Sequence, residues 1–279
     1  MQYPQRCLLF VPGSRPERFE KAFSAGADMV CIDLEDAVVM DQKDQARRNV
    51  VAFLMQRSPT KQKLVVRINP LETESGVSDA SALSSIANPP DFVMLPKVRT
   101  AADLERARDA LGTGQRLIAL LECPQSILNA DAIAAGSEAL DYLMFGGADF
   151  SVEMGCDMSW NALLAARGYL AMVAAKHGKG LIDVPFLDVG DPSGLQTEAR
   201  LVRSMGFTAK SAIHPSQVLP IQAIFTPSEE AAAKARKIIL AFENSGKEGA
   251  ILVDGRLVDK PVLLAARQTL AAFGAASAS

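Results

Sequence analysis

Short hydrophobic runs recur along the chain, and each is followed by a longer stretch in which polar and apolar residues are mixed. The runs are almost continuously apolar, which is typical of parallel strands that are buried on both faces. The pattern predicts eight strands, at Cys7–Val11, Met29–Asp33, Leu64–Ile68, Phe92–Leu95, Leu117–Leu121, Tyr142–Phe145, Leu181–Val184 and, less regularly, Thr208–Ile213.

The stretches between these runs carry helix signals. Thr100 precedes a helical pattern over 101–111 that Gly112 ends, and Ser193 is a candidate cap for a helix over 194–205. Strands that alternate with helices in this way predict a (β/α)8 TIM barrel. A doubly wound open sheet is the alternative. However, no G-x-G-x-x-G motif follows the first strand, and polar residues follow nearly every strand rather than one switch point.

The repeat stops after Phe225. Beyond it, the pattern predicts helices at 228–244 and 260–273, an extended pair over 250–258 that turns at Asp254-Gly255, and a frayed tail over 274–279. We therefore expect a barrel domain over residues 1–225 and a C-terminal helical extension over residues 226–279.

Composition narrows the class of protein. A chain of 279 residues can bury one large core, and 29 Lys and Arg against 32 Asp and Glu argue against a surface for nucleic acid. No apolar run is long enough for a signal peptide or a membrane span. The four cysteines lack metal-site spacing and are interpreted as buried thiols of a cytoplasmic protein. Two histidines exclude a multi-histidine zinc site, so any metal must be held mainly by carboxylates.

Charged and polar groups follow almost every predicted strand. Barrel enzymes carry their catalytic groups at the carboxyl ends of the strands, so these residues predict an active site at one rim. They include Glu35 and Asp36 after the second strand, Arg67 on the third, Lys97 after the fourth, Glu122 after the fifth, the segment 146–149 after the sixth and His214 after the eighth.

Two of these groups are candidate metal ligands. Glu122 and Asp149 follow adjacent strands, and two carboxylates suit Mg²⁺, which keeps several waters and takes few protein ligands. Ion pairs of these carboxylates with Arg67 or Lys97 are the alternative. The planar fork of Arg67 suits a substrate carboxylate or an enolate oxygen.

Other assignments at this rim also remain open. Arg67 alternatively pairs with Glu35 or Asp36. Backbone N–H groups near Gly147 and Ala148 fit a bound carboxylate, although a tight turn explains the glycines equally well. A lone histidine at a strand end is more often structural than catalytic, so His214 is not assigned a role.

Seven motifs in this order resemble the citrate lyase β-subunit-like family of the HpcH/HpaI aldolase superfamily, and they span nearly the whole chain. The motifs are Leu9-Phe-Val-Pro-Gly-Ser14, Cys31-Ile-Asp-Leu-Glu-Asp-Ala37, Val66-Arg-Ile-Asn69, Leu95-Pro-Lys97, Ala119-Leu-Leu-Glu122, Gly146-Gly-Ala-Asp149 and Ala212-Ile-His-Pro215. One departure is Cys123-Pro124 after Glu122, where the family commonly has Thr-Ala. Since Pro124 can open the next helix, the ligand survives this change.

The resemblance implies a Mg²⁺-dependent lyase of β-hydroxyacyl thioesters that forms trimers or hexamers. Glu122 and Asp149 would be the metal ligands, and Arg67 would contact the carboxylate or enolate. Glu35 and Asp36 would orient water and Arg67. The segment Gly255-Arg-Leu-Val-Asp259-Lys-Pro261 is similar to one by which CoA-ester lyases place an acid/base aspartate in a neighbouring subunit's site. Asp259 is then a candidate proton donor as well as a helix cap.

We therefore hypothesise a carbon–carbon lyase that cleaves citramalyl-CoA or malyl-CoA to acetyl-CoA and a 2-oxoacid (pyruvate or glyoxylate). Arg15 and Lys21, near the first loop, are candidate contacts for CoA phosphates, although solvated helix charges are the simpler interpretation. The alternatives are a citrate lyase β subunit that acts on citryl-acyl carrier protein, a CoA-independent 2-oxoacid aldolase, and a non-catalytic barrel subunit.

Overall fold

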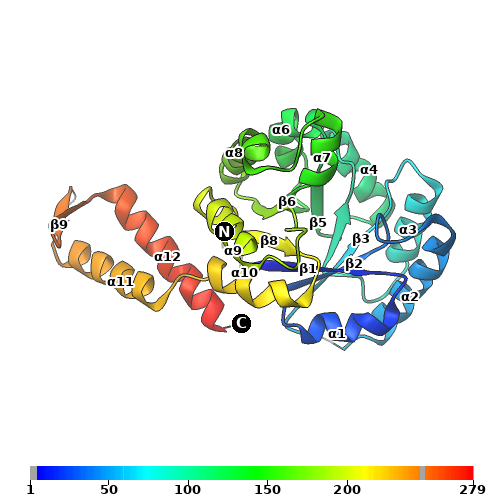
Figure 1. Cartoon of the computed structure of the whole chain (residues 1–279), viewed down its shortest axis with the longest axis horizontal. Coiled ribbons are helices and arrows are strands. Elements are labelled where there is room, and N and C mark those ends of the chain that lie inside the picture. Colours follow the sequence, from blue (N-terminus) through cyan, green and yellow to red (C-terminus); the bar gives the residue numbers. More distant parts are fainter. Residues whose placement is uncertain (1–4, 59, 246–248, 279) are drawn as a thin grey trace.

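Eight parallel strands close into a barrel in the computed structural model, which describes residues 5–58, 60–245 and 249–278 (Figure 1). Each strand pairs with the next, and the eighth pairs back onto the first, with Cys7 opposite Lys210. The predicted TIM barrel is confirmed, and the open sheet is excluded. The strands are β1 (Cys7–Pro12), β2 (Met29–Asp33), β3 (Lys63–Arg67), β4 (Phe92–Leu95), β5 (Leu117–Leu121), β6 (Leu140–Phe145), β7 (Gly180–Asp183) and β8 (Ala209–Ala212).

Helices between the strands cover the outside of the barrel. They are α1 (Phe19–Ser24), α2 (Lys43–Gln56), α3 (Glu74–Ser84), α4 (Ala101–Leu111), α5 (Pro124–Leu128), α6 (Ala130–Ala135), α7 (Gly147–Met154), α8 (Trp160–His177), α9 (Pro192–Ser204) and α10 (Val218–Phe225), with 3-10 turns η1 (Pro16–Arg18), η2 (Met40–Gln42) and η3 (Pro215–Gln217). In this described part, no helix is both long enough and apolar enough to cross a bilayer.

Of the two helix caps predicted at Thr100 and Ser193, the first is confirmed and the second is wrong. The predicted cap Thr100 does precede α4, where it forms a capping box with Asp103. The prediction that Ser193 caps the later helix is wrong. Asp191 is the cap of α9, because its side chain accepts a hydrogen bond from the Gly194 amide, and Pro192 fits the first helical position.

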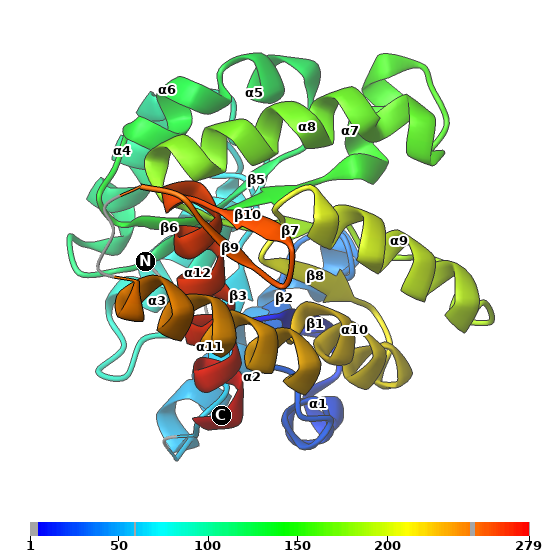
Figure 2. The ribbon, with the colours of Figure 1, turned by 90° about the vertical axis from the view of Figure 1, so that its left-hand side faces the viewer.

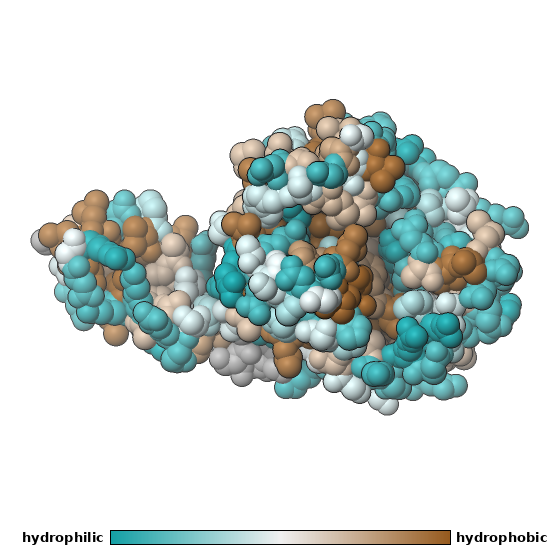
Figure 3. Space-filling model, in the orientation of Figure 1, coloured by the Kyte–Doolittle hydropathy of each residue, from teal (hydrophilic) through white to brown (hydrophobic). Residues whose placement is uncertain are grey.

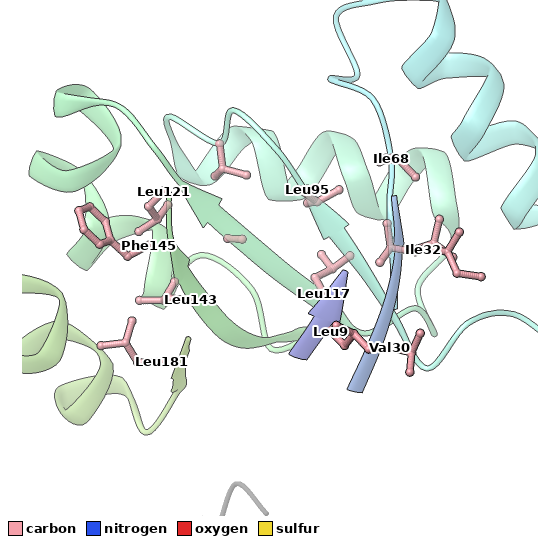
Figure 4. Packing of buried hydrophobic residues seen from close by; sticks show 14 of the residues in the cluster. Leu9, Val30, Ile32, Ile68, Leu95, Leu117, Leu121, Leu143, Phe145 and Leu181 are labelled. Carbon is pink, nitrogen blue, oxygen red and sulfur yellow. The ribbon is translucent and has the colours of Figure 1, made fainter. Parts of the chain in front are cut away.

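Alternation along each strand divides the buried side chains into two layers. One set fills the barrel interior, and its members include Leu8, Cys31, Val65, Leu120 and Met144. The other set points outward and packs beneath the helices, where the close view in Figure 4 shows it around β2, β5 and β6. Because both faces of every strand are buried, the strands are almost continuously apolar in sequence.

A charged cluster interrupts the outer layer between the barrel and the helices. Lys210 of β8 donates to Asp183 of β7 and to Glu198 of α9, both at 2.7 Å. Arg167 of α8 donates to the same Asp183 at 2.9 Å. The side chains of Arg167, Asp183 and Lys210 are fully buried, so the two cations are compensated by Asp183 together with the partly exposed Glu198.

The chain after the barrel forms a separate arm of α11 (Glu229–Asn244), a hairpin of β9 (Ile251–Val253) and β10 (Arg256–Val258), and α12 (Lys260–Ala278). The two helices pack mainly against each other and project from the barrel (Figures 1 and 2). The hairpin turns at Asp254-Gly255, as predicted. The expected fraying over 274–278 is wrong, because α12 continues there through alanine, the strongest helix former. Ser279 lies outside the described residues.

The charged cluster yields a prediction on stability. Asp183→Asn removes the fully buried anion of the cluster, which pairs with both buried cations, so the free energy of unfolding in urea should fall by about 3 to 5 kcal/mol. Glu243→Gln is the control, because Glu243 pairs with Arg267 at 3.5 Å on the exposed arm. Loss of that exposed pair should cost under about 1 kcal/mol. Equal effects of the two substitutions would contradict the role of the cluster.

Candidate active site

A pocket of about 360 Å³ opens at the carboxyl ends of the barrel strands. Three of its polar residues lie on the same side of the chain as the side chains that fill the barrel interior. Asp33, Arg67 and Glu122 each follow an interior residue of the same strand by two positions, at Cys31, Val65 and Leu120. The lining residues are Phe10, Asp33, Asp36, Ala37, Arg67, Leu120, Glu122, Met144, Gly146, Ala148, Asp149, Val184, Pro185, Leu187 and Ile213.

Arg67 is held in one orientation by Asp33. Its Nε donates to Asp33 Oδ1 at 2.7 Å, and its Nη2 donates to Oδ2 at 2.5 Å. The Asp33 oxygens also accept the backbone amides of Glu35 at 2.9 Å and Ala37 at 3.0 Å. The guanidinium lies over the ring of Phe10, 5.3 Å from the ring centroid. Arg67 is therefore a fixed cation with few rotamers available to it.

Glu35 and Asp36 share the remaining edge of the guanidinium. Arg67 Nη1 lies 2.7 Å from Glu35 Oε2 and 3.1 Å from Asp36 Oδ2. Burial raises the pKa of Glu35 to about 8. Although burial opposes it, the hydrogen bond with Glu35 and the charge of Arg67 lower the pKa of Asp36. A proton held between the two carboxyls therefore belongs to Glu35 at neutral pH.

Two buried polar side chains hold the loop that carries Glu35 and Asp36. Lys43 donates to the carbonyl oxygens of Leu34 and Glu35, both at 2.9 Å. Asn69 donates to the Leu34 carbonyl at 2.9 Å and to Asp79 at 2.7 Å. These bonds fix a loop that has no regular secondary structure of its own, so the two carboxyls reach Arg67 from a rigid support.

Glu122 stands at the end of β5, and only 4% of it is exposed. Its Oε1 accepts the backbone amide of Lys97 at 2.7 Å. Gly146 lies against it so closely that a Cβ at position 146 would come within 2.3 Å of the Glu122 Cβ. Burial raises the pKa of Glu122 to about 7, which is the effect expected of a carboxyl whose charge is poorly compensated.

The helix after Glu122 begins where the sequence predicts. Pro124 is the first residue of α5, and the Cys123 thiol accepts the Ser126 amide at 3.3 Å as the cap. Cys123 is buried and does not line the pocket. With Cys123-Pro124 at this point, Glu122 still lines the pocket.

Asp149 completes the polar lining of the pocket, and Lys97, which is not a lining residue, adds a cation beside it. Asp149 lies in the first turn of α7, and its carboxylate contacts the Lys97 ammonium. The same ammonium lies 3.6 Å from Glu122 Oε1. Lys97 has a backbone φ of 54°, a left-handed conformation that is rare outside glycine and asparagine, and this conformation accompanies the bond from its amide to Glu122.

The donor set at Glu122 and Asp149 fits a hard divalent cation. Two carboxylates from adjacent strand ends converge on one positive charge, and all of their donor atoms are oxygens. Within the described residues, no group of three His, Cys, Asp or Glu side chains is placed to hold a metal. Substrate and water oxygens would therefore supply the other ligands, an arrangement typical of Mg²⁺.

The opposite side of the pocket is apolar. Leu187 and Ile213 are about half exposed at its rim, and Val184 and Met144 are buried deeper. A polar side built on the ends of β2, β3 and β5 and the first turn of α7 thus faces an apolar side contributed mainly by Met144 of β6 and by the segments after β7 and β8. Such a pocket suits a small ligand with one charged and one apolar face.

The remaining sequence-predicted residues are placed as follows. Ala148 lines the pocket, and Gly147, next to it, is the first residue of α7. Arg15 and Lys21 are exposed near η1 and α1 and do not line the pocket. Asp259 lies on the arm, where it accepts the Val262 amide at 3.2 Å, and it is also not part of the chain's own pocket.

Sequence reasoning missed two roles at this site. Asp33 was predicted only as the end of a strand, but it anchors Arg67. Asp33 follows Met29 and Cys31 at every second position, so the sequence could have placed it on the inward face of the strand. The left-handed backbone of Lys97 had no signal in the sequence. His214, which was left unassigned, caps η3 by accepting the Ser216 amide at 3.2 Å.

Known proteins resemble this chain over most of its length. An L-malyl-CoA/beta-methylmalyl-CoA lyase of Cereibacter sphaeroides is 36% identical, over 92% of this chain and 90% of that one. A (3S)-malyl-CoA thioesterase of the same species is also 36% identical, over 96% and 94%. The crystal structure of CitE from Mycobacterium tuberculosis, in complex with magnesium, acetoacetate and coenzyme A, matches with a TM-score of 0.83 at 33% identity, over 97% and 98%.

The family assignment rests on both the sequence and the fold. The HpcH/HpaI aldolase/citrate lyase model matches residues 6–215, which include every barrel strand and the whole polar side of the pocket. The resemblance found from the seven sequence motifs is therefore confirmed. The protein belongs to the HpcH/HpaI aldolase/citrate lyase family.

Proposed function

We propose that the protein is a Mg²⁺-dependent carbon–carbon lyase that cleaves citramalyl-CoA or malyl-CoA to acetyl-CoA and pyruvate or glyoxylate. The observation that carries the proposal is the convergence of Glu122 and Asp149 beside an anchored Arg67. Two comparisons support the proposal. One relative, which is 36% identical, is named as a lyase, and the CitE structure is a complex with magnesium and coenzyme A.

Glu122 and Asp149 would hold the metal, and a bound Mg²⁺ supplies a Lewis acid for the substrate's hydroxyl and carboxylate oxygens. Cleavage of the carbon–carbon bond turns the hydroxyl carbon into the carbonyl of the 2-oxoacid and releases the hydroxyl proton. The bonding electron pair passes to the thioester as an enolate. Arg67 is the fixed cation toward which that negative charge develops, so its orientation need not change during the reaction.

Glu35 and Asp36 act on Arg67 and on nearby water. Both contact the same Nη1 of Arg67, so they hold the edge of the guanidinium that Asp33 does not reach. Since Glu35 keeps its proton at neutral pH, it can donate a hydrogen bond within this group. The backbone of Gly147 and Ala148 lies beside Asp149, one of the proposed metal ligands, where a substrate carboxylate would bind.

We further propose that residues 1–225 form the catalytic barrel and that residues 226–279 complete the site of a neighbouring subunit in a trimer or hexamer. Asp259 would protonate the enolate carbon there, while also capping α12. The arm exposes Leu252, Leu257 and Leu264, which suits burial against another subunit, and Figure 3 shows hydrophobic residues among polar ones on the surface of the arm. Arg15 and Lys21 remain candidates for the CoA phosphates.

A thioester panel tests the reaction. The purified protein should cleave malyl-CoA or citramalyl-CoA, lose activity in EDTA and regain it with MgCl₂. Glu122→Gln and Asp149→Asn should each lower kcat/KM by about 10²-fold or more, because each removes a charged ligand. Glu153→Gln should have no effect, since Glu153 is exposed on the same helix as Asp149. Cleavage of only citryl-carrier protein, or of no thioester, would reject the assignment.

A subunit-mixing experiment tests Asp259. Asp259→Asn should lower kcat by about 10²-fold or more with little change in Mg²⁺ affinity, because the proton donor is lost and the metal ligands remain. Asp254→Asn, in the hairpin turn of the same arm, is the control. Mixed with Glu122→Gln and reassembled, the Asp259→Asn protein should regain part of the activity, since one chain offers an intact pocket and the other an intact arm. No recovery on reassembly would contradict action between subunits.

The protonation of Glu35 predicts an unequal pair of substitutions. Glu35→Gln should retain most of kcat at pH 7, since an amide resembles the protonated carboxyl that a pKa of about 8 implies. Glu35→Ala should lower kcat by about tenfold to 10²-fold, because Arg67 loses a contact at 2.7 Å and is free to shift. The measurement is steady-state kinetics with the best thioester of the panel. Equal losses in the two variants would show that the charge of Glu35 is required.

A further inference from the structure

The Lys97 ammonium lies against both carboxylates that would hold the metal. It contacts the Asp149 carboxylate and is 3.6 Å from Glu122 Oε1. A Mg²⁺ ion must come within about 2.0 to 2.1 Å of each ligand oxygen. An ammonium this close to the two carboxylates therefore competes electrostatically with the metal for them.

The backbone of Lys97 cannot easily follow its side chain away from the site. Its amide donates to Glu122 Oε1 at 2.7 Å, and its backbone φ of 54° is a left-handed conformation that few residues other than glycine adopt. Motion is thus confined to the four-carbon stem, and about a third of the side chain is exposed to solvent. The stem can rotate outward while the amide continues to hold Glu122 in place.

The other cation of the pocket has no such freedom. Arg67 is bound by both oxygens of Asp33 and by Glu35 and Asp36, and 11% of its side chain is exposed. The pocket therefore contains one fixed cation and one movable cation. Only the movable one lies against both candidate metal ligands.

We propose that Lys97 is a built-in competitor for the metal. Its ammonium holds the Glu122 and Asp149 carboxylates close together, and metal entry displaces it toward solvent. Lys97 thereby lowers the affinity of the site for Mg²⁺. The inference rests on the metal site of the proposed function, but it concerns a residue with no role in that reaction.

Calorimetric titration of EDTA-treated protein with MgCl₂ alone, without substrate, tests the proposal. Lys97→Met keeps the stem and the amide but removes the charge, so it should bind Mg²⁺ about three- to tenfold more tightly than the wild type. Lys97→Arg keeps the charge and should show no gain in affinity. Lys63→Met is the matched control, because Lys63 pairs with Asp91 at 3.0 Å at the opposite end of the barrel strands.

Thermal unfolding gives a second readout that does not depend on activity. Without metal, Lys97→Met should melt below the wild type, because two neighbouring carboxylates lose their counter-ion. Added MgCl₂ should raise its Tm by more than it raises that of the wild type, since tighter binding stabilises the folded state more. Lys63→Met should respond to MgCl₂ as the wild type does.

The outcomes separate this inference from the proposed function. Equal or weaker Mg²⁺ binding by Lys97→Met, in a wild type that does bind the metal, overturns the competition and leaves the metal site intact. A gain in affinity for Lys97→Arg or Lys63→Met also overturns it, because the effect would then not come from the charge at position 97. Absence of Mg²⁺ binding in the wild type and in every variant rejects the metal site itself.

Discussion

Closure of the barrel requires the side chains of every strand to alternate between the interior and the outer face. Both the core and the chemistry of this protein depend on this alternation. Alternate residues must face the interior, where apolar side chains exclude water. At the carboxyl ends the same positions continue into the pocket, so the alternation that buries Cys31, Val65 and Leu120 also brings Asp33, Arg67 and Glu122 together. A shift of one residue in any of these strands would turn its polar group into the layer beneath the helices.

Charge at the barrel mouth is arranged around two different cations. Arg67 is surrounded by carboxyls of the β2 loop and is rigid, whereas Lys97 bridges to the carboxylates of β5 and α7 and has a flexible stem. Burial raises the pKa of a carboxyl on each side, Glu35 beside Arg67 and Glu122 beside Lys97. The two halves of the polar wall therefore differ in the freedom of their cations and not in the burial of their carboxyls.

The fold and most of this pocket could be predicted from sequence, because continuous apolar runs and strand-end charges are local signals. The eight strands were predicted within a few residues, and Glu122, Asp149, Arg67, Glu35 and Asp36 do lie together. The rest depends on contacts between distant segments. The Ser193 cap failed because Asp191 reaches the same amides, and the anchoring of Arg67 by Asp33 spans two strands. The metal ligands, the exact substrate and the role of Asp259 stay predictions, since each depends on a second molecule.

The contact between Gly146 and Glu122 has a consequence for how such a protein can change during evolution. Any side chain at position 146 would collide with Glu122, so this part of the polar wall tolerates almost no variation. Leu187 and Ile213, in contrast, lie half exposed at the ends of β7 and β8 and can change without disturbing the carboxylates. We therefore expect changes in acyl-substrate preference to arise from substitutions on the apolar side of the pocket, while the residues of the chemical step stay the same.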